Sequence, residues 1–279
     1  MNEQNLDYLN RQIKFTGFGE GHASDLKAKL EKGEKEFVLL HNQDFGKDQA
    51  GATMHFRKSD NSELYFFNRY ALLLKTDQYP DPFKQTFYIN PKQDNITLKE
   101  AYNMLSGRSV LKEMTPKEGD KYMAWLHLDF KDINANGQFK VVQLNPKNGF
   151  DLEAMLHKHP IQELNTNEGI KRMLESLERG NRQQVTYGPP GQEQKVYVEA
   201  SPKFKSLNFY DSSMKRVLSY DILPKLAQSE SQKQGVVEAR SVGQSVQTES
   251  KGESAKKTEK ANKTEKQAPV KKKTQKMSR

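Results

Sequence analysis

Hydrophobic and polar residues repeat one pattern three times along residues 1–226. A short segment with helical spacing ends on a glycine, and a strand, a polar glycine turn and a second strand follow it. The helix glycines are Gly33, Gly107 and Gly180, and the turn glycines are Gly46, Gly119 and Gly191. This pattern predicts an α+β fold of three repeated modules, each a short helix plus a small antiparallel sheet.

Each expected helix has residues that suit its two ends. The N-terminal caps would be Ser24 or Asp25 in the first module, Thr97 with Glu100 as a capping box in the second, and Asn165, Thr166 or Asn167 in the third. The third helix has the clearest apolar face, with Ile170, Met173, Leu174 and Leu177 at helical spacing. A terminal glycine accepts the left-handed conformation in which many helices end.

The expected strands follow the helices in order. In the first module they are Phe37–His41, Ala52–Phe56, Glu63–Lys75 and Phe83–Asn90; in the second Ser109–Met114, Tyr122–Phe130 and Gln138–Asn145; in the third Gln184–Tyr187 and Lys195–Ala200. Turns of the form Asn/Ser-Pro-Lys, at Asn90, Asn145 and Ser201, close a strand in each module. Two further helices are expected at Asn2–Arg11 and Asp151–His157.

The basic charge of the chain is concentrated at its C-terminal end. The whole sequence has a net charge of +9, but residues 227–279 hold 13 Lys and Arg against 6 Asp and Glu, a net charge of +7. All aromatic residues lie at or before Tyr220, and the last Leu or Ile is Leu226. Because residues 227–279 contain almost nothing that can form a core, they are predicted to be a disordered basic tail. The domain organisation is therefore 1–95 for an N-terminal helix and the first module, 96–160 and 161–226 for the other modules, and 227–279 for the tail.

Composition excludes several classes of protein. The chain has no cysteine, so disulfide frameworks, thiolate nucleophiles and Cys-based metal or iron–sulfur sites are excluded. It has no stretch approaching the ~20 apolar residues that span a bilayer, and its first residues lack the pattern of a secretory signal. We therefore expect a cytoplasmic protein with no membrane partner.

Several short motifs suggest chemistry only weakly. Gly17–Gly21 stands between a predicted short strand, Ile13–Phe15, and a helix start, but it lacks the Lys-Ser/Thr of a phosphate-binding loop and is interpreted as a flexible turn. His157 and His159 are two residues apart, a poor spacing for a metal pair on a helix. Acidic pairs such as Asp129 with Asp132, or Glu36 with Asp44, are expected by chance in a chain with 29% charged residues. No catalytic residue, metal or cofactor is predicted.

Two groups of residues, one mainly aromatic and one basic, are candidates for ligand binding. The run Tyr65–Tyr70, with Arg57, Lys58 and Phe87–Tyr88, fits core packing better than a stacking platform for single-stranded nucleic acid. Around the third helix, Lys171, Arg172, Arg179 and Arg182 are largely neutralised by Glu168, Glu175 and Glu178. A solvated helix face is the favoured interpretation of this cluster.

The third module resembles domains of unknown function in Bacteroidota proteins. The shared features are the helix ending from Leu177 to Gly180, a hairpin around Gly191, and a strand containing Val196 and Val198. The second module begins with a similar helix pattern. The part of the chain before the tail, with its Gly17–Glu20 element, is similar to free-standing proteins of that phylum. Such domains are often carried by conjugative or other mobile elements, sometimes fused or adjacent to a DNA topoisomerase. The resemblance implies no catalytic residue, and it associates the chain with DNA only indirectly.

The tail carries the main functional hypothesis. Lysines on a flexible arm neutralise phosphates without discriminating between base sequences. We therefore expect a non-enzymatic accessory protein that binds nucleic acid without sequence specificity through its tail, while the α+β body contacts a protein partner. The predicted nucleic-acid-binding residues are Lys256, Lys257, Lys260, Lys263, Lys266, Lys271, Lys272, Lys273, Lys276 and Arg279. The alternatives are a protein–protein adaptor whose tail only solubilises, and, less favoured, an enzyme acting on nucleic acid.

Overall fold

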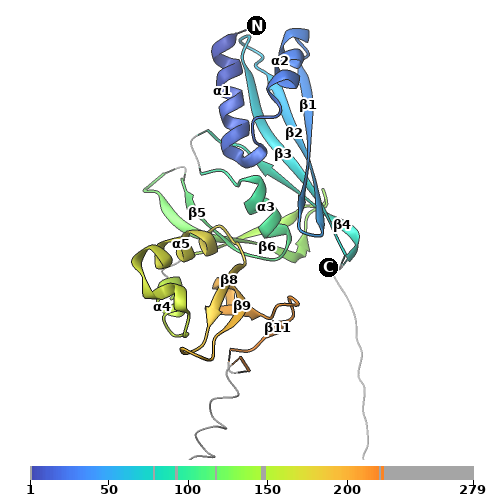
Figure 1. Ribbon diagram of the computed structural model, residues 1–279. Helices are drawn as coiled ribbons and strands as arrows, with labels where there is room; N and C mark the ends of the chain where they lie inside the picture. Colours follow the sequence, from blue (N-terminus) through green and yellow to red (C-terminus); the bar gives the residue numbers. More distant parts are fainter. Residues whose placement is uncertain are drawn as a thin grey trace, which may run out of the picture. The chain divides into compact units, whose positions relative to one another are not determined.

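A computed structural model describes residues 2–77, 79–91, 94–116, 118–145, 149–219 and 221–222 (Figure 1). It has an α+β fold with three small antiparallel sheets, which confirms the predicted fold class. The helical segments are α1 (Glu3–Ile13), η1 (Lys14–Phe18), α2 (Ala23–Lys32), α3 (Leu98–Leu105), α4 (Leu152–Leu156), η3 (Gln162–Asn165), α5 (Asn167–Glu178) and η4 (Pro202–Phe204). The predicted tail, 227–279, lies outside the described residues.

The first sheet consists of four long strands in the order in which they occur along the chain. They are β1 (Glu36–Phe45), β2 (Asp48–Lys58), β3 (Tyr65–Thr76) and β4 (Tyr79–Tyr88). Alternate side chains on the inner face, such as Met54 and Leu72, pack with Leu9 and Ile13 of α1 and Leu26 of α2. The helices thus cover the inner face, and the side chains on the outer face remain partly or fully exposed.

The second sheet has its central strand buried on both faces. Its strands are β5 (Val110–Met114), β6 (Tyr122–Ile133) and β7 (Phe139–Leu144), in the order β5-β6-β7. Ala124, Leu126 and Leu128 of β6 belong to the core of the first sheet, whereas Trp125 belongs to a second core. Strand β6 therefore does not have one buried face and one solvated face.

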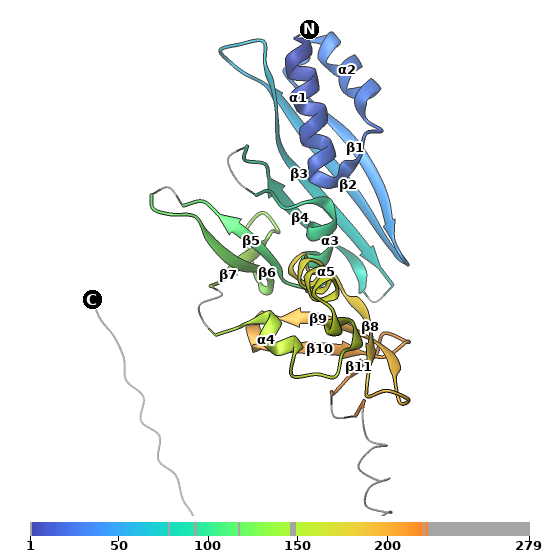
Figure 2. The ribbon, with the colours of Figure 1, turned by 60° about the vertical axis from the view of Figure 1, so that its left-hand side comes forward.

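The third sheet, in the order β11-β10-β9-β8, supplies most of the second core. Its strands are β8 (Gln183–Tyr187), β9 (Gln194–Ser201), β10 (Ser206–Tyr210) and β11 (Arg216–Val217). Met173 and Leu177 of α5 are buried there, together with Leu156 of α4 and Val198 of β9. Helix α5 contacts β5, β8 and β9, so it lies between the second and third sheets (Figures 1 and 2).

Some local expectations differ from the structure. The strand expected at Ile13–Phe15 is helical, because α1 runs through Ile13 and continues into η1. Helix α2 begins after His22, which makes no side-chain cap, rather than at Ser24 or Asp25. The capping box of Thr97 and Glu100 is confirmed, and Thr166 caps α5 by accepting a hydrogen bond from the Gly169 amide.

Candidate functional site

The outer face of the first sheet brings aromatic and basic side chains together in register. Arg69 of β3 is directly opposite Tyr88 of β4 and, on its other side, opposite His55 of β2. One row further, Phe66 of β3 is opposite Arg57 of β2. Phe66 is 45% exposed and Tyr88 is 74% exposed, so both rings are accessible to a ligand. We call this surface, with Lys84 of β4, the outer-face cluster.

The pattern of this surface depends on a β-bulge. The register between β2 and β3 shifts between His55 and Phe56, which leaves Asn68 as an extra residue on β3. Tyr65 and Phe67 before the bulge and Tyr70 after it all point into the core. Core packing, the favoured interpretation of the aromatic run, therefore holds for these three rings, whereas Phe66 lies on the opposite face. Strict alternation along the sequence cannot show this, because an inserted residue changes the face on which later side chains lie.

Positive charge dominates the centre of the outer-face cluster. Among the described residues, Arg69 and Lys84 form no ion pair, whereas Arg57 pairs with Asp60 at 2.9 Å and Glu36 at 3.6 Å. Burial lowers the pKa of His55 most, and the charges of Arg69 and Lys84 lower it further, whereas the charge of Glu36 raises it. The cluster therefore combines accessible aromatic rings with cations that are free to bind an anion.

A hollow of about 430 Å³ adjoins this cluster. Its lining includes His55, Arg57 and Arg69 from the outer face and Lys29 near the end of α2. The carboxylates of Glu34 and Glu36 also line it and pair with Lys29 and Arg57. The surface around it is also partly apolar, since Val38, Leu40 and Leu73 are exposed large hydrophobic residues. Among the described residues, Arg69 is the lining Arg or Lys that the two carboxylates leave unpaired, so this face can bind a negatively charged group beside its exposed side chains.

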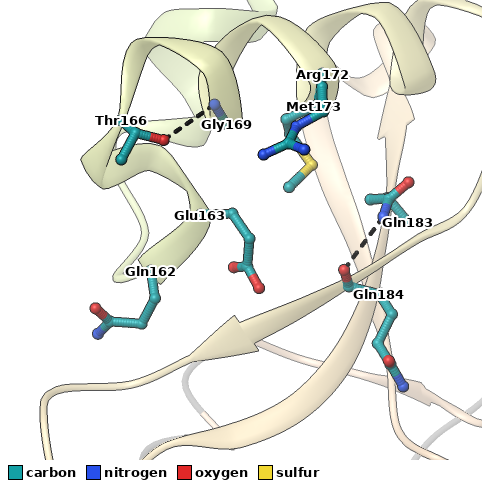
Figure 3. Close-up of a pocket in the computed structure, with 8 residues that line it drawn as sticks. All are labelled: Gln162, Glu163, Thr166, Gly169, Arg172, Met173, Gln183 and Gln184. Atoms are coloured by element: carbon teal, nitrogen blue, oxygen red, sulfur yellow. Dashed lines mark hydrogen bonds between the residues drawn. The ribbon is translucent and has the colours of Figure 1, made fainter.

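A second hollow lies beside strand β8 and is polar (Figure 3). Its volume is about 470 Å³, and Glu163, Arg172, Gln183 and Gln184 contribute to its lining. The Glu163 carboxylate accepts hydrogen bonds from the amide of Thr186 at 2.9 Å and from its hydroxyl at 2.9 Å. Glu163 therefore satisfies a backbone donor on the edge strand, which is a structural task that protects the edge of the sheet.

The other residues that the sequence singles out are not brought together into a site. His157 is at the C-terminal end of α4, and the ring of His159 packs edge-on to Phe209 at 4.8 Å. Asp132 pairs with Lys140 at 2.8 Å. Among the described residues, no group of three or more His, Asp or Glu side chains is placed to hold a metal ion.

The basic residues around α5 are separated by their contacts. Arg172 pairs with Glu168 one helical turn earlier, at 3.5 Å, as a solvated helix face predicts. Arg182, by contrast, pairs with Glu199 of β9 at 3.0 Å. The predicted nucleic-acid-binding residues, Lys256, Lys257, Lys260, Lys263, Lys266, Lys271, Lys272, Lys273, Lys276 and Arg279, all lie outside the described residues.

Comparison of the chain with protein-family models, with curated proteins and with solved structures finds no match. In the part of the chain that the structure describes, every helix is too short or too polar to cross a membrane.

Proposed function

We propose that this protein is a non-enzymatic accessory protein that binds single-stranded nucleic acid without sequence specificity. The observation that carries the proposal is the outer-face cluster, where the exposed rings of Phe66 and Tyr88 lie in register with Arg57 and Arg69. Bases stack on aromatic rings whatever their identity, and cations beside the rings neutralise the phosphates. A duplex hides the faces of its bases, so this surface favours an unpaired strand.

The Lys-rich segment supports the same function. Residues 227–279 hold a net charge of +7, whereas residues 1–226 hold +2. Its lysines would add affinity for phosphates without adding sequence preference. The resemblance to domains found beside DNA topoisomerases is in keeping with this proposal, although it assigns no residue. The body would thus bind bases, and the tail would increase the attraction to the backbone.

The direct test measures binding of a fluorescent single-stranded oligonucleotide to the full chain by anisotropy. We expect Phe66→Ala combined with Tyr88→Ala to weaken binding by about 30-fold, because each lost stacking contact costs about 1–3 kcal/mol. The matched control is Phe204→Ala, which removes an equally exposed ring, 72% accessible, from η4 of the third module. Unchanged affinity in the double variant, with native circular dichroism, would contradict the proposal.

A second candidate function is a protein–protein adaptor, and one observation favours it. Val38, Leu40 and Leu73 expose apolar surface on the same face of the first sheet, and exposed apolar patches mark interaction surfaces. The two functions differ in their response to salt, because counterion release weakens nucleic-acid binding steeply and apolar association very little. Absence of nucleic-acid binding at low salt in both the full chain and residues 1–226 would favour the adaptor.

A further inference from the structure

A pocket of about 540 Å³ lies where residues of all three modules meet, and we call it the junction pocket. The first sheet contributes Tyr79 and Phe83, the second contributes Phe130, and the turn after α3 contributes Arg108. Arg182, just before β8, brings the third module to the same pocket. Its volume is within the range of sites that hold small molecules.

Aromatic rings form one side of the junction pocket. The ring of Phe83 meets Tyr79 edge-on at 5.0 Å and Phe130 edge-on at 5.6 Å. Tyr102 of α3 adds a further ring, which stacks on Phe45 of β1 at 4.2 Å. Tyr79 is 54% exposed, so it lies at the open side of the pocket rather than in the core. A planar ring can therefore enter and pack against these side chains.

Two guanidinium groups provide the positive charge of the pocket. Arg108 donates from Nε to the carbonyl oxygen of Gly180 at 2.9 Å and from Nη2 to Oδ1 of Asn103 at 2.6 Å. Arg182 donates from Nε and Nη2 to the same oxygen of Glu199, at 3.2 and 3.0 Å. A guanidinium has five N–H donors, so each group is held in place while donors remain for a ligand.

Of the two guanidinium groups, Arg182 pairs with Glu199, whereas Arg108 forms no ion pair among the described residues. Asp48 is the acidic residue of the lining, and it accepts a hydrogen bond from the hydroxyl of Tyr102 at 2.9 Å. Burial lowers the pKa of Arg108 most, Tyr102 and Glu199 oppose this effect, and the charge of Arg182 adds a smaller lowering. A guanidinium without a carboxylate partner, partly removed from water and with donors left over, attracts an anion.

We propose that the junction pocket binds a single nucleotide unit, with the base against Tyr79 and Phe83 and the phosphate between Arg108 and Arg182. An aromatic ring with a phosphate matches both sides of the pocket, and Arg is suited to bind phosphate through paired donors. The ligand can be a free mononucleotide or the phosphorylated end of a strand. The pocket is separate from the outer-face cluster, so this inference does not depend on the proposed function.

The test uses isothermal titration calorimetry of the full chain with AMP, adenosine and inorganic phosphate. We expect AMP to bind with a Kd of about 1 mM or tighter, and adenosine and phosphate to bind more weakly than AMP. Tyr79→Ala should weaken AMP binding about tenfold, as expected for one lost stacking contact, and Tyr79→Phe should retain it. Arg182→Lys keeps the charge beside Glu199 but removes the paired donors, so it should also weaken AMP binding.

Tyr88→Ala is the matched control, because it removes an exposed tyrosine from the outer-face cluster and leaves the pocket intact. Tyr88→Ala should weaken binding of the single-stranded oligonucleotide and leave AMP binding unchanged. Tyr79→Ala, by contrast, should weaken AMP binding. Oligonucleotides with a 5′-phosphate or a 5′-hydroxyl then distinguish a free mononucleotide from the end of a strand as the ligand. Only a site that binds strand ends prefers the oligonucleotide with the 5′-phosphate. No detectable AMP binding, or AMP binding unaffected by Tyr79→Ala, would overturn the inference.

Discussion

A Cβ atom at Gly180 would lie 2.7 Å from the carbonyl oxygen of Ser109. This contact joins the end of α5 in the third module to the residue before β5 in the second. The backbone φ of Gly180 is +75°, a conformation that residues with a side chain rarely adopt. The carbonyl of Gly180 also accepts the hydrogen bond from Arg108, and Asn103 donates to the carbonyl of Arg179 at 2.7 Å. Glycine is therefore required here both by the helix end and by the packing of two modules.

We expect Gly180→Ala to lower the free energy of unfolding by about 3 kcal/mol. About 1–2 kcal/mol comes from the left-handed backbone and the rest from overpacking against Ser109. Gly33→Ala is the matched control, because Gly33 ends α2 with a φ of +69° and a Cβ there would meet nothing within 4 Å. Gly33→Ala should lower the free energy of unfolding by only about 1 kcal/mol. Urea unfolding of both variants gives the comparison, and equal losses would argue against the packing role of Gly180.

A buried ion pair joins α3 to the second sheet. Lys112 of β5 lies 2.8 Å from Glu100, and their side chains are only 5% and 7% exposed. We expect Lys112→Met to destabilise the protein by about 3 kcal/mol, since it leaves the Glu100 carboxylate buried without a cation. Glu100→Gln should cost less, because Lys112 keeps its ion pair with Asp94 at 3.0 Å. The double variant should lose less free energy of unfolding than the sum of the losses in the two single variants.

Lys140→Met is the control for that measurement. Lys140 pairs with Asp132 at 2.8 Å, but both side chains are more than half exposed. An exposed pair contributes little, so this change should alter the free energy of unfolding by no more than about 1 kcal/mol. Additive effects of Glu100→Gln and Lys112→Met in chemical denaturation would show that the buried pair is not coupled.

Stability is expected to fall as the pH decreases below about 6.5, the usual pKa of histidine. Burial lowers the pKa values of His22, His55, His127 and His159 in the folded protein. The unfolded chain therefore binds more protons than the folded one just below pH 6.5, and acid favours unfolding. The stabilisation is complete above that pH and is lost as the pH falls through the lowered pKa values. In thermal unfolding, the Tm should stay level from pH 8 to about pH 6.5 and decrease from there to pH 5.

His127→Gln is expected to flatten this pH dependence. His127 lies on β6, is 9% exposed, and its Nδ1 atom is buried without a hydrogen-bond partner among the described residues. Removing the imidazole removes one group that must be deprotonated in the folded state. A variant whose Tm falls with acid as steeply as that of the unmodified protein would exclude His127 as a contributor.

Salt dependence tests the cations of the outer-face cluster. For single strands, each phosphate contact contributes about 0.7 to the slope of log K against log salt. Arg69→Ala and Lys84→Ala should each reduce the slope by about this amount, whereas Lys121→Ala, which removes an exposed charge paired with Glu113, should not. Ending the chain at Leu226 removes a net charge of +7 and should reduce the slope more than either substitution. An unchanged slope in Arg69→Ala and Lys84→Ala would place the phosphate contacts elsewhere.

Most elements of this fold, and several of their ends, can be predicted from the sequence alone, although the strand expected at Ile13–Phe15 is helical. Helical spacing, the Thr97–Glu100 capping box and the positive-φ glycines, among them Gly33 and Gly180, depend on residues close together in the chain. Such signals are local, so they can be recognised in one sequence without knowledge of the partners of each element. The predicted disorder and role of residues 227–279 also come from composition alone and stay predictions.

Strand pairing and packing in three dimensions set which of these elements meet and which side chains they expose. The bulge at Asn68 places Phe66 on the outer face and Tyr70 in the core, and the antiparallel register sets Arg69 beside Tyr88. Contact between Gly180 and Ser109 joins residues of different modules, as does the junction pocket. These relationships depend on pairing and packing between distant residues, which periodicity along the chain does not encode. The aromatic run 65–70 indicates the region of the first site, but only the bulge and the strand register show which of its rings are exposed. The junction pocket draws on three modules, so no single stretch of sequence indicates it.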